Sequence, residues 1–136
     1  MLSPTLATWR LTLHVLSASV WVGGQLVLAG LVPRLRSLSP DAPRTVARAF
    51  NRIAWPAFAI AVVTGMWNLA AIKIGDTSPA YQITVAIKLL AVTVSGVAAL
   101  AHAMSRTKLV LAIGGALGLL GALLALFLGV LLRTGT

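Results

Sequence analysis

The sequence predicts an all-α integral membrane protein, a four-transmembrane-helix bundle that runs up-down-up-down with both termini outside. Of its 136 residues, 59% are hydrophobic and only 10% are charged, and the mean hydropathy is +0.97. A soluble domain of this length could not bury so much apolar surface. The chain has room for about four spans of ~20 residues each. We therefore expect residues 1–136 to form a single membrane domain.

The first span is expected at about residues 10–32, and polar side chains recur within it. These lie on one side of a helix because they are three or four residues apart: His14, Ser17, Trp21 and Gln25. A polar group that faces lipid has no partner, so this side should face other helices or a ligand held between them. Gly23 and Gly24 remove side chains halfway along, where another backbone or a flat ligand can come close.

A connection outside the hydrocarbon is expected over residues 33–43, because Pro33, Pro40 and Pro43 disfavour a continuous helix. Five arginines lie in or beside it: Arg34, Arg36, Arg44, Arg48 and Arg52. The positive-inside rule places this connection in the cytoplasm and the N-terminus outside. Asp41 is expected to begin an interfacial helical turn that leads into the second span.

The second span is expected at about residues 53–72, with Pro56 in its first turn, where a missing N–H costs little. Near its other end, Thr64-Gly65-Met66-Trp67-Asn68 combines small, soft, aromatic and polar side chains. An outer loop is expected from Lys73 to Gln82. This loop has a single basic residue, which agrees with the assigned orientation.

The third span is expected at about residues 83–104. Steps of four and seven residues return to nearly the same face of a helix, which therefore carries Thr84, Lys88, Ser95 and His102. A basic turn at residues 105–108 precedes the fourth span, at about 109–132, which has no charged residue and five glycines. Gly114 and Gly118 form a small-xxx-small pair, which allows close helix packing within the chain or self-association into a homo-oligomer.

Composition excludes several classes of function. The sequence has no cysteine, so disulfides, thiolate metal sites and iron–sulfur clusters are ruled out. A net charge of +9 would suggest nucleic acid as the partner of a soluble chain. Here the basic residues lie mostly between hydrophobic spans, so membrane topology explains them and the expected partner is the lipid bilayer, not nucleic acid.

Three spans are expected to bring possible ligands to one layer of the membrane. His14 and Lys88 each lie about one turn, or ~6 Å, inside the outer ends of their spans, and Met66 and Trp67 arrive at a similar level. No acidic residue lies within any expected span. The Lys88 ammonium can therefore snorkel to the interface, or the side chain can ligate a metal as a neutral amine or pair with an anionic group such as a haem propionate. His102 lies too far along its span to share a metal ion with His14.

Motifs in these three spans resemble a known family. They are His14-x6-Trp21-Val-Gly23-Gly24, Val63-Thr64-Gly65-Met66 and Ile87-Lys88-Leu89-Leu90, and they resemble the membrane domain of the copper resistance protein D (CopD) family. The first and third are also similar to motifs of HemJ-type protoporphyrinogen oxidases. The latter resemblance implies haem b bound through His14 and Lys88, with a possible oxidoreductase activity. The former implies copper uptake or resistance. Both favour a bacterial cytoplasmic (inner) membrane.

The leading hypothesis is a haem-binding membrane protein with a redox or electron-transfer role. Haem b would lie near the outer face, with His14 and Lys88 as ligands and with Trp21, Gly24 and Met66 beside it. One alternative is copper binding or transport through His14 and Met66, although three methionines and no cysteine are few soft ligands for a path. The other is a non-catalytic subunit of a larger membrane complex, in which the polar residues only hold helices together.

Overall fold

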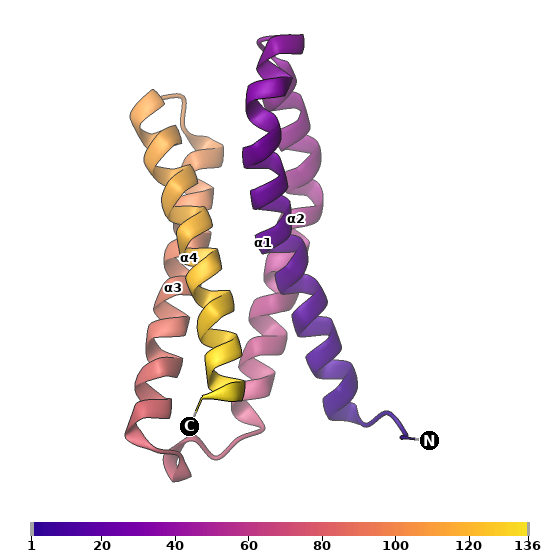
Figure 1. Cartoon of the computed structure of the whole chain (residues 1–136), viewed down its shortest axis with the longest axis vertical. Helices are drawn as coiled ribbons and strands as arrows, with labels where there is room; N and C mark the ends of the chain where they lie inside the picture. Colours follow the sequence, from indigo (N-terminus) through magenta and orange to yellow (C-terminus); the bar gives the residue numbers. More distant parts are fainter. Residues whose placement is uncertain (1, 136) are drawn as a thin grey trace. The chain divides into compact units, whose positions relative to one another are not determined.

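The computed structural model describes residues 2–135 and, over that range, consists of helices and their connections without any strand (Figure 1). The long helices are α1 (Leu6–Leu38), α2 (Ala42–Ala70), α3 (Pro79–Met104) and α4 (Lys108–Thr134), and a short 3₁₀ helix, η1 (Ile74–Asp76), lies between α2 and α3. Each of these four α-helices is long and apolar enough to cross a membrane. The predicted all-α membrane class is confirmed, whereas the orientation of the termini stays a prediction.

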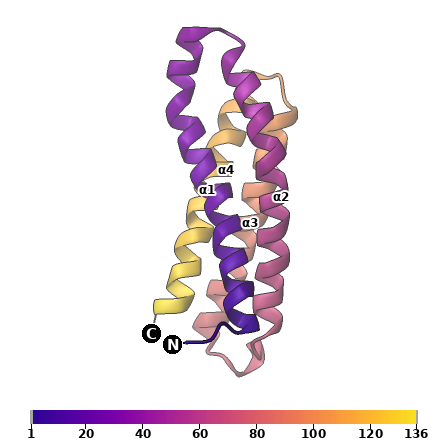
Figure 2. The ribbon, with the colours of Figure 1, turned by 90° about the vertical axis from the view of Figure 1, so that its right-hand side faces the viewer.

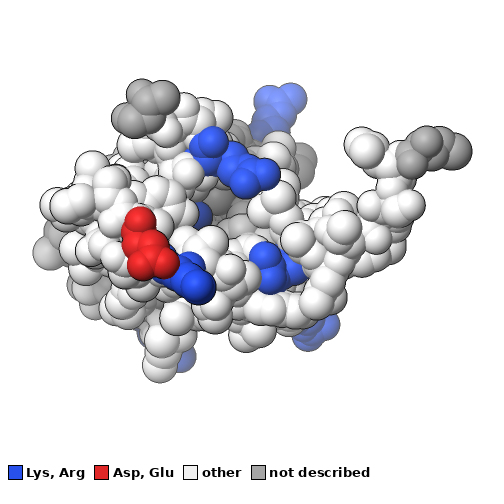
Figure 3. Space-filling model, turned by 90° about the horizontal axis from the view of Figure 1, so that it is seen from below, with Lys and Arg blue, Asp and Glu red and all other residues white. Residues whose placement is uncertain are grey.

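Contacts divide the chain between Ile72 and Lys73 into two compact units, each of which is a helical hairpin. α1 packs against α2 in the first hairpin, and α3 packs against α4 in the second. Figures 1 and 2 show that the two helices within each hairpin run antiparallel. Charged side chains are sparse on the face shown in Figure 3, where separate basic groups and a small acidic patch interrupt a mostly uncharged surface.

The helices of the first hairpin are longer than predicted. The connection expected over residues 33–43 is wrong: α1 continues through Pro33 to Leu38, and α2 begins at Ala42. An internal proline frees only one carbonyl, four residues earlier, and membrane helices re-satisfy such groups through waters, hydroxyls or small local adjustments. Pro43 lies in the first turn of α2, where proline is well tolerated.

The start of the second span is corrected in the same way. Pro56 was expected in the first turn, but it lies inside α2 because the residues before it are also helical. At 1.5 Å per residue, α1, with 33 residues, is ~50 Å long and α2, with 29, is ~44 Å. Both exceed the ~30 Å of hydrocarbon in a bilayer. The five exposed arginines therefore lie on helices, in the last two turns of α1 and the first three turns of α2, not in an irregular loop.

Small residues form the interface of the second hairpin. The buried residues of α3 are Ala91, Ser95, Gly96 and Ala98, and those of α4 include Gly114, Gly118, Gly121 and Ala122. A Cβ added at Gly114 would lie 2.8 Å from the carbonyl oxygen of Ala98, so the two backbones are close. The prediction that Gly114 and Gly118 allow close packing is confirmed, and α3 of the same chain is the helix they contact.

Candidate functional site

The imidazole of His14 lies between α1 and α2 and is held through its Nδ1 atom. This atom is 2.9 Å from the carbonyl oxygen of Ala61 and 3.1 Å from the hydroxyl oxygen of Thr64. A carbonyl oxygen only accepts, so Nδ1 carries the hydrogen. The Thr64 hydroxyl donates to the carbonyl of Ile60 at 2.6 Å, so its oxygen also accepts from His14. In the neutral ring the lone pair is therefore on Nε2.

Gly65 allows the His14 ring to approach α2. A Cβ added at Gly65 would lie only 3.0 Å from Cε1 of the imidazole. Thr64, next to it, is only 5% exposed and points toward the same ring. The Thr64-Gly65 pair therefore supplies a second acceptor, beside the Ala61 carbonyl, and the space for the His14 ring. The sequence predicted that this stripe of α1 faces protein, and the burial of Ser17 and Trp21 confirms it.

Arg10 lies one helical turn before His14 and contacts the C-terminal end of α2. Its Nε donates to Oδ1 of Asn68 at 2.6 Å, and its Cζ lies 5.6 Å from the centre of the Trp67 ring. The remaining N–H donors of the guanidinium are on its two terminal nitrogens. Sequence reasoning did not select Arg10 as a site residue. Its spacing of four residues from His14 was the signal, since it places both residues on one face of the helix.

Met66 follows Gly65 by one residue, which turns it about 100° around α2 from the position that contacts His14. The side chain of Met66 is 49% exposed, and that of Trp67 is 43% exposed. The ring of Trp67 contacts Arg10, which lies one helical turn before His14. The role of Met66 as a ligand stays a prediction.

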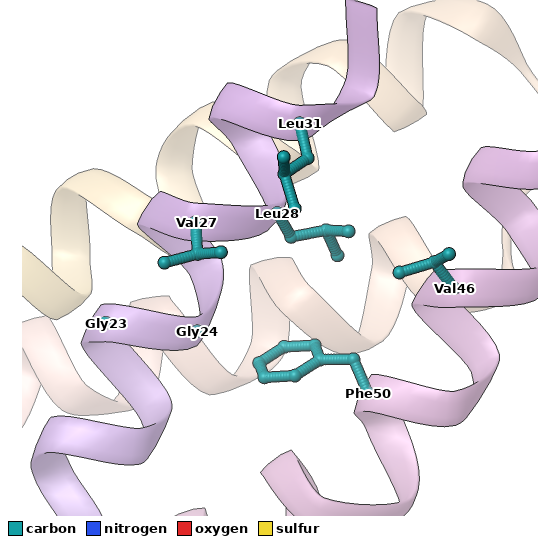
Figure 4. Close-up of a pocket in the computed structure, with 7 residues that line it drawn as sticks. All are labelled: Gly23, Gly24, Val27, Leu28, Leu31, Val46 and Phe50. Carbon is teal, nitrogen blue, oxygen red and sulfur yellow. The ribbon is translucent and has the colours of Figure 1, made fainter. Parts of the chain in front are cut away.

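Trp21 and Gly24 are occupied by packing within the first hairpin. Trp21 is 6% exposed, and its ring centre lies 5.3 Å from that of Trp55 and 4.4 Å from that of Phe58. Phe50 points from α2 toward Gly24 (Figure 4), and its ring fills the space that a Cβ at this position would need. We expected another backbone or a flat ligand to approach here, and the group that does so is the chain's own aromatic side chain.

Lys88 belongs to the second hairpin, where it lies against α4. A Cβ added at Gly129 would be 2.9 Å from Nζ of Lys88. On the same face of α3, the buried hydroxyl of Ser95 donates to the carbonyl of Gly118 at 2.7 Å. His102 bonds through Nδ1 to the carbonyl of Leu111 at 2.6 Å. The predicted shared face of Lys88, Ser95 and His102 is therefore confirmed, and α4 is the helix that it contacts. Pairing of Lys88 with His14 at one ligand stays a prediction.

The donor set around His14 limits the kind of metal centre that it suits. Within residues 2–135, no three His, Cys, Asp or Glu side chains gather closely enough to hold a metal ion. A free ion in a protein site commonly takes three or four protein ligands. Haem iron is already held by the macrocycle and needs only one or two axial ligands from the protein. A single oriented imidazole therefore suits haem better than a free ion.

Comparisons of the chain with protein-family models, with curated proteins and with solved structures gave no match.

Proposed function

We propose that the chain is a CopD-like protein of the bacterial cytoplasmic membrane that binds haem b through His14 and has a redox or electron-transfer role. The observation that carries this proposal is the hydrogen bond from Nδ1 of His14 to the Ala61 carbonyl. Histidines that ligate metals usually donate their other ring N–H to a carbonyl or carboxylate, which fixes the tautomer and orients the ring. The metal ligand would then be Nε2.

Each neighbouring residue has a role under this proposal. Ala61 and Thr64 hold the imidazole plane by accepting from Nδ1, and Gly65 leaves room for the ring. Arg10, which contacts Asn68 and Trp67, lies one helical turn before His14 on α1. Haem propionates are anionic, so Arg10 is a suitable partner for one of them. Haem b, when bound, supplies one-electron redox chemistry at a potential set by its axial ligand and burial.

The test is an ultraviolet–visible spectrum of detergent-purified protein, made with ample haem and recorded oxidised and then reduced with dithionite. We expect a Soret band that sharpens on reduction, with separate α and β bands. The His14→Ala variant should lose this spectrum while keeping its helical circular dichroism. His102→Ala is the matched control, because it removes an imidazole hydrogen-bonded to a backbone carbonyl of α4. A featureless wild-type spectrum would overturn the proposal.

The second axial ligand proposed from the sequence is Lys88, and Lys88→Met tests it. Loss of the lysine amine should change the Soret position and the ligand-field bands if both residues bind iron. An unchanged spectrum would leave His14 as the proposed ligand and would remove Lys88. Oxidation of protoporphyrinogen, the activity that the HemJ-type resemblance suggests, should be assayed once haem is found.

Copper handling is the alternative that replaces haem if the spectrum is featureless. Metal analysis should then find copper that decreases in both His14→Ala and Met66→Leu. A subunit role would instead be indicated by a stable partner after mild detergent extraction. Self-association through α4 would have to use a face other than the one that contacts α3, since Gly114, Gly121 and Gly129 are occupied there. Chemical crosslinking in membranes tests it.

A further inference from the structure

An apolar groove lies in the first hairpin, between α1 and α2 on the side nearer the arginine-rich turn. Its volume is about 240 Å³. It is lined by Gly23, Val27, Leu28 and Leu31 from α1 and by Val46 and Phe50 from α2. Figure 4 shows Leu28 pointing from α1 toward α2, with Phe50 and Val46 extending from the other side. No polar side chain lines the groove among these residues.

The two glycines of α1 have different surroundings in this groove. The ring of Phe50 covers Gly24, which lets α2 pack closely at that position. A Cβ added at Gly23, in contrast, would have no atom within 4 Å. The groove is therefore open beside Gly23. An apolar surface of this kind accepts a flexible hydrocarbon and offers nothing to a polar ligand.

A positive charge lies at the end of the groove nearer the turn. Gly23, Val27, Leu31 and Arg34 follow at steps of four, four and three residues, so they share one face of α1. Arg34 is exposed and lies about one turn beyond Leu31. Asp41 is the single acidic residue among residues 1–72, against five arginines in 34–52. This end of the hairpin therefore attracts an anion.

The distance along α1 from Gly23, at the far end of the groove, to Arg34 is close to the thickness of one lipid leaflet. From Gly23 to Arg34 the helix advances eleven residues, or ~16 Å at 1.5 Å per residue. Half of the ~30 Å hydrocarbon thickness is ~15 Å. With Arg34 at the level of the headgroups, the apolar groove reaches to about the middle of the bilayer.

We propose that this groove, together with Arg34, is a binding site for an anionic phospholipid. One acyl chain lies between α1 and α2 along Gly23, Val27 and Leu31, and the phosphate pairs with the Arg34 guanidinium. Three observations support the site: the open apolar groove, the distance of ~16 Å from Gly23 to Arg34 along α1, and the positive charge of Arg34 at the end of the groove nearer the turn. The site does not depend on haem binding, because His14 is near the other end of the hairpin.

The test is native mass spectrometry of the full chain released from detergent with phosphatidylglycerol or phosphatidylcholine of identical acyl chains. We expect phosphatidylglycerol to be retained and phosphatidylcholine to bind at least about fivefold more weakly, since one arginine near a lipid surface contributes ~1 kcal/mol. Arg34→Gln should remove this preference. Arg36→Gln is the matched control, because two residues turn it to another face of α1.

A second pair of variants tests the acyl chain. Gly23→Leu adds a side chain where a Cβ would meet no atom within 4 Å, and should weaken phosphatidylglycerol retention more than about tenfold by displacing about two methylene groups. Ala29→Leu is its control, because Ala29 is exposed, is absent from the groove lining and is turned to another face of α1. Val46→Trp fills the groove from α2 and should reproduce the effect of Gly23→Leu.

Three outcomes would overturn the proposal. Equal retention of the two lipids would contradict the headgroup selectivity, and equal retention by Gly23→Leu and Ala29→Leu would contradict binding in the groove. Displacement of the lipid by glycerol phosphate, which has the headgroup charge but no acyl chain, would indicate a phosphate site in place of a lipid site. Circular dichroism of each variant identifies any loss of binding that comes from loss of helix.

Discussion

At the scale of single residues, His14 is oriented by a carbonyl that no sequence motif could reveal. The spacing of polar residues on α1 predicted that His14 faces protein, and its contact with Gly65 confirms this. Its main acceptor, the carbonyl of Ala61, is 47 residues away. Every residue has such a carbonyl, so only the packing of α1 on α2 selects this one.

Arg10 provides a test of the proposed site that leaves the iron ligand unchanged. If Arg10 pairs with a propionate, Arg10→Gln should accelerate haem loss by about fivefold, a modest effect because the pair lies in a partly exposed position. The Soret position should not change, since His14 keeps its contacts. The measurement is the rate of haem transfer to excess apomyoglobin.

Arg36→Gln is the matched control for Arg10→Gln, because Arg36 lies in the last turn of the same helix, far from His14. Equal transfer rates for the wild-type protein and both variants would show that Arg10 does not hold the ligand.

Ser95 makes a buried hydrogen bond between helices whose contribution can be measured separately. Ser95→Ala removes the hydroxyl that donates to Gly118 and leaves that carbonyl without this donor. Interhelical hydrogen bonds in membrane proteins contribute ~0.6 kcal/mol on average and at most ~1.7 kcal/mol. We expect destabilisation in this range, measured by unfolding in mixed micelles with increasing sodium dodecyl sulfate.

Thr93→Ala is the control for Ser95→Ala, because the exposed Thr93 hydroxyl donates to Leu89 of its own helix. Its removal should change the free energy of unfolding by less than the loss of Ser95. A larger effect at Thr93 would contradict the importance assigned to the bond between α3 and α4.

At the scale of helices, the two hairpins achieve close packing by different means. α1 and α2 interlock large side chains, with Phe50 over Gly24 and Trp21 against Phe58. α3 and α4 instead bring backbones together along small residues, so that a Cβ at Gly121 would lie 2.9 Å from the carbonyl oxygen of Ala91. Sequence reasoning identified the glycine-rich helix but not its partner, since a small-xxx-small pair suits any neighbouring helix.

Because α3 and α4 pack backbone against backbone, we expect a large side chain at Gly121 to lower the free energy of unfolding. Leucine there would meet the backbone of Ala91 and Ser95, which cannot rotate away as a side chain would. Forced separation of the helices should cost about 1–3 kcal/mol, the usual range for overpacking. The same detergent unfolding measures it.

Ala116→Leu is the control for Gly121→Leu, because Ala116 is exposed on α4. It adds comparable apolar volume outside the interface and should leave the free energy of unfolding nearly unchanged. Equal destabilisation by both variants would contradict the close approach of α3 and α4 at Gly121.

At the scale of the whole molecule, the arrangement of charge predicts how the chain crosses the membrane. The five arginines lie in the last two turns of α1 and the first three turns of α2, and the connection between α2 and α3 has Lys73 and Asp76. The positive-inside rule therefore places the first turn in the cytoplasm.

Because the chain has no cysteine, single introduced cysteines report topology without background. Ser3→Cys and Thr77→Cys should react with an impermeant maleimide added to intact spheroplasts. Ser37→Cys should react only after the membrane is opened. The reverse labelling pattern would place the arginines outside and contradict the predicted orientation.

The sequence by itself determined that this is a helical membrane protein with four spans, because length and hydropathy decide which segments a bilayer accepts. It also determined which faces of α1 and α3 are directed to protein, because helical periodicity places polar residues together. The helix ends were decided only by the tertiary structure, since Pro33 and Pro56 lie inside helices that neighbouring residues continue. The partners of His14, Arg10 and Gly24 were decided there too. Each partner lies on another helix, and local sequence patterns do not specify which distant groups two packed surfaces bring into contact.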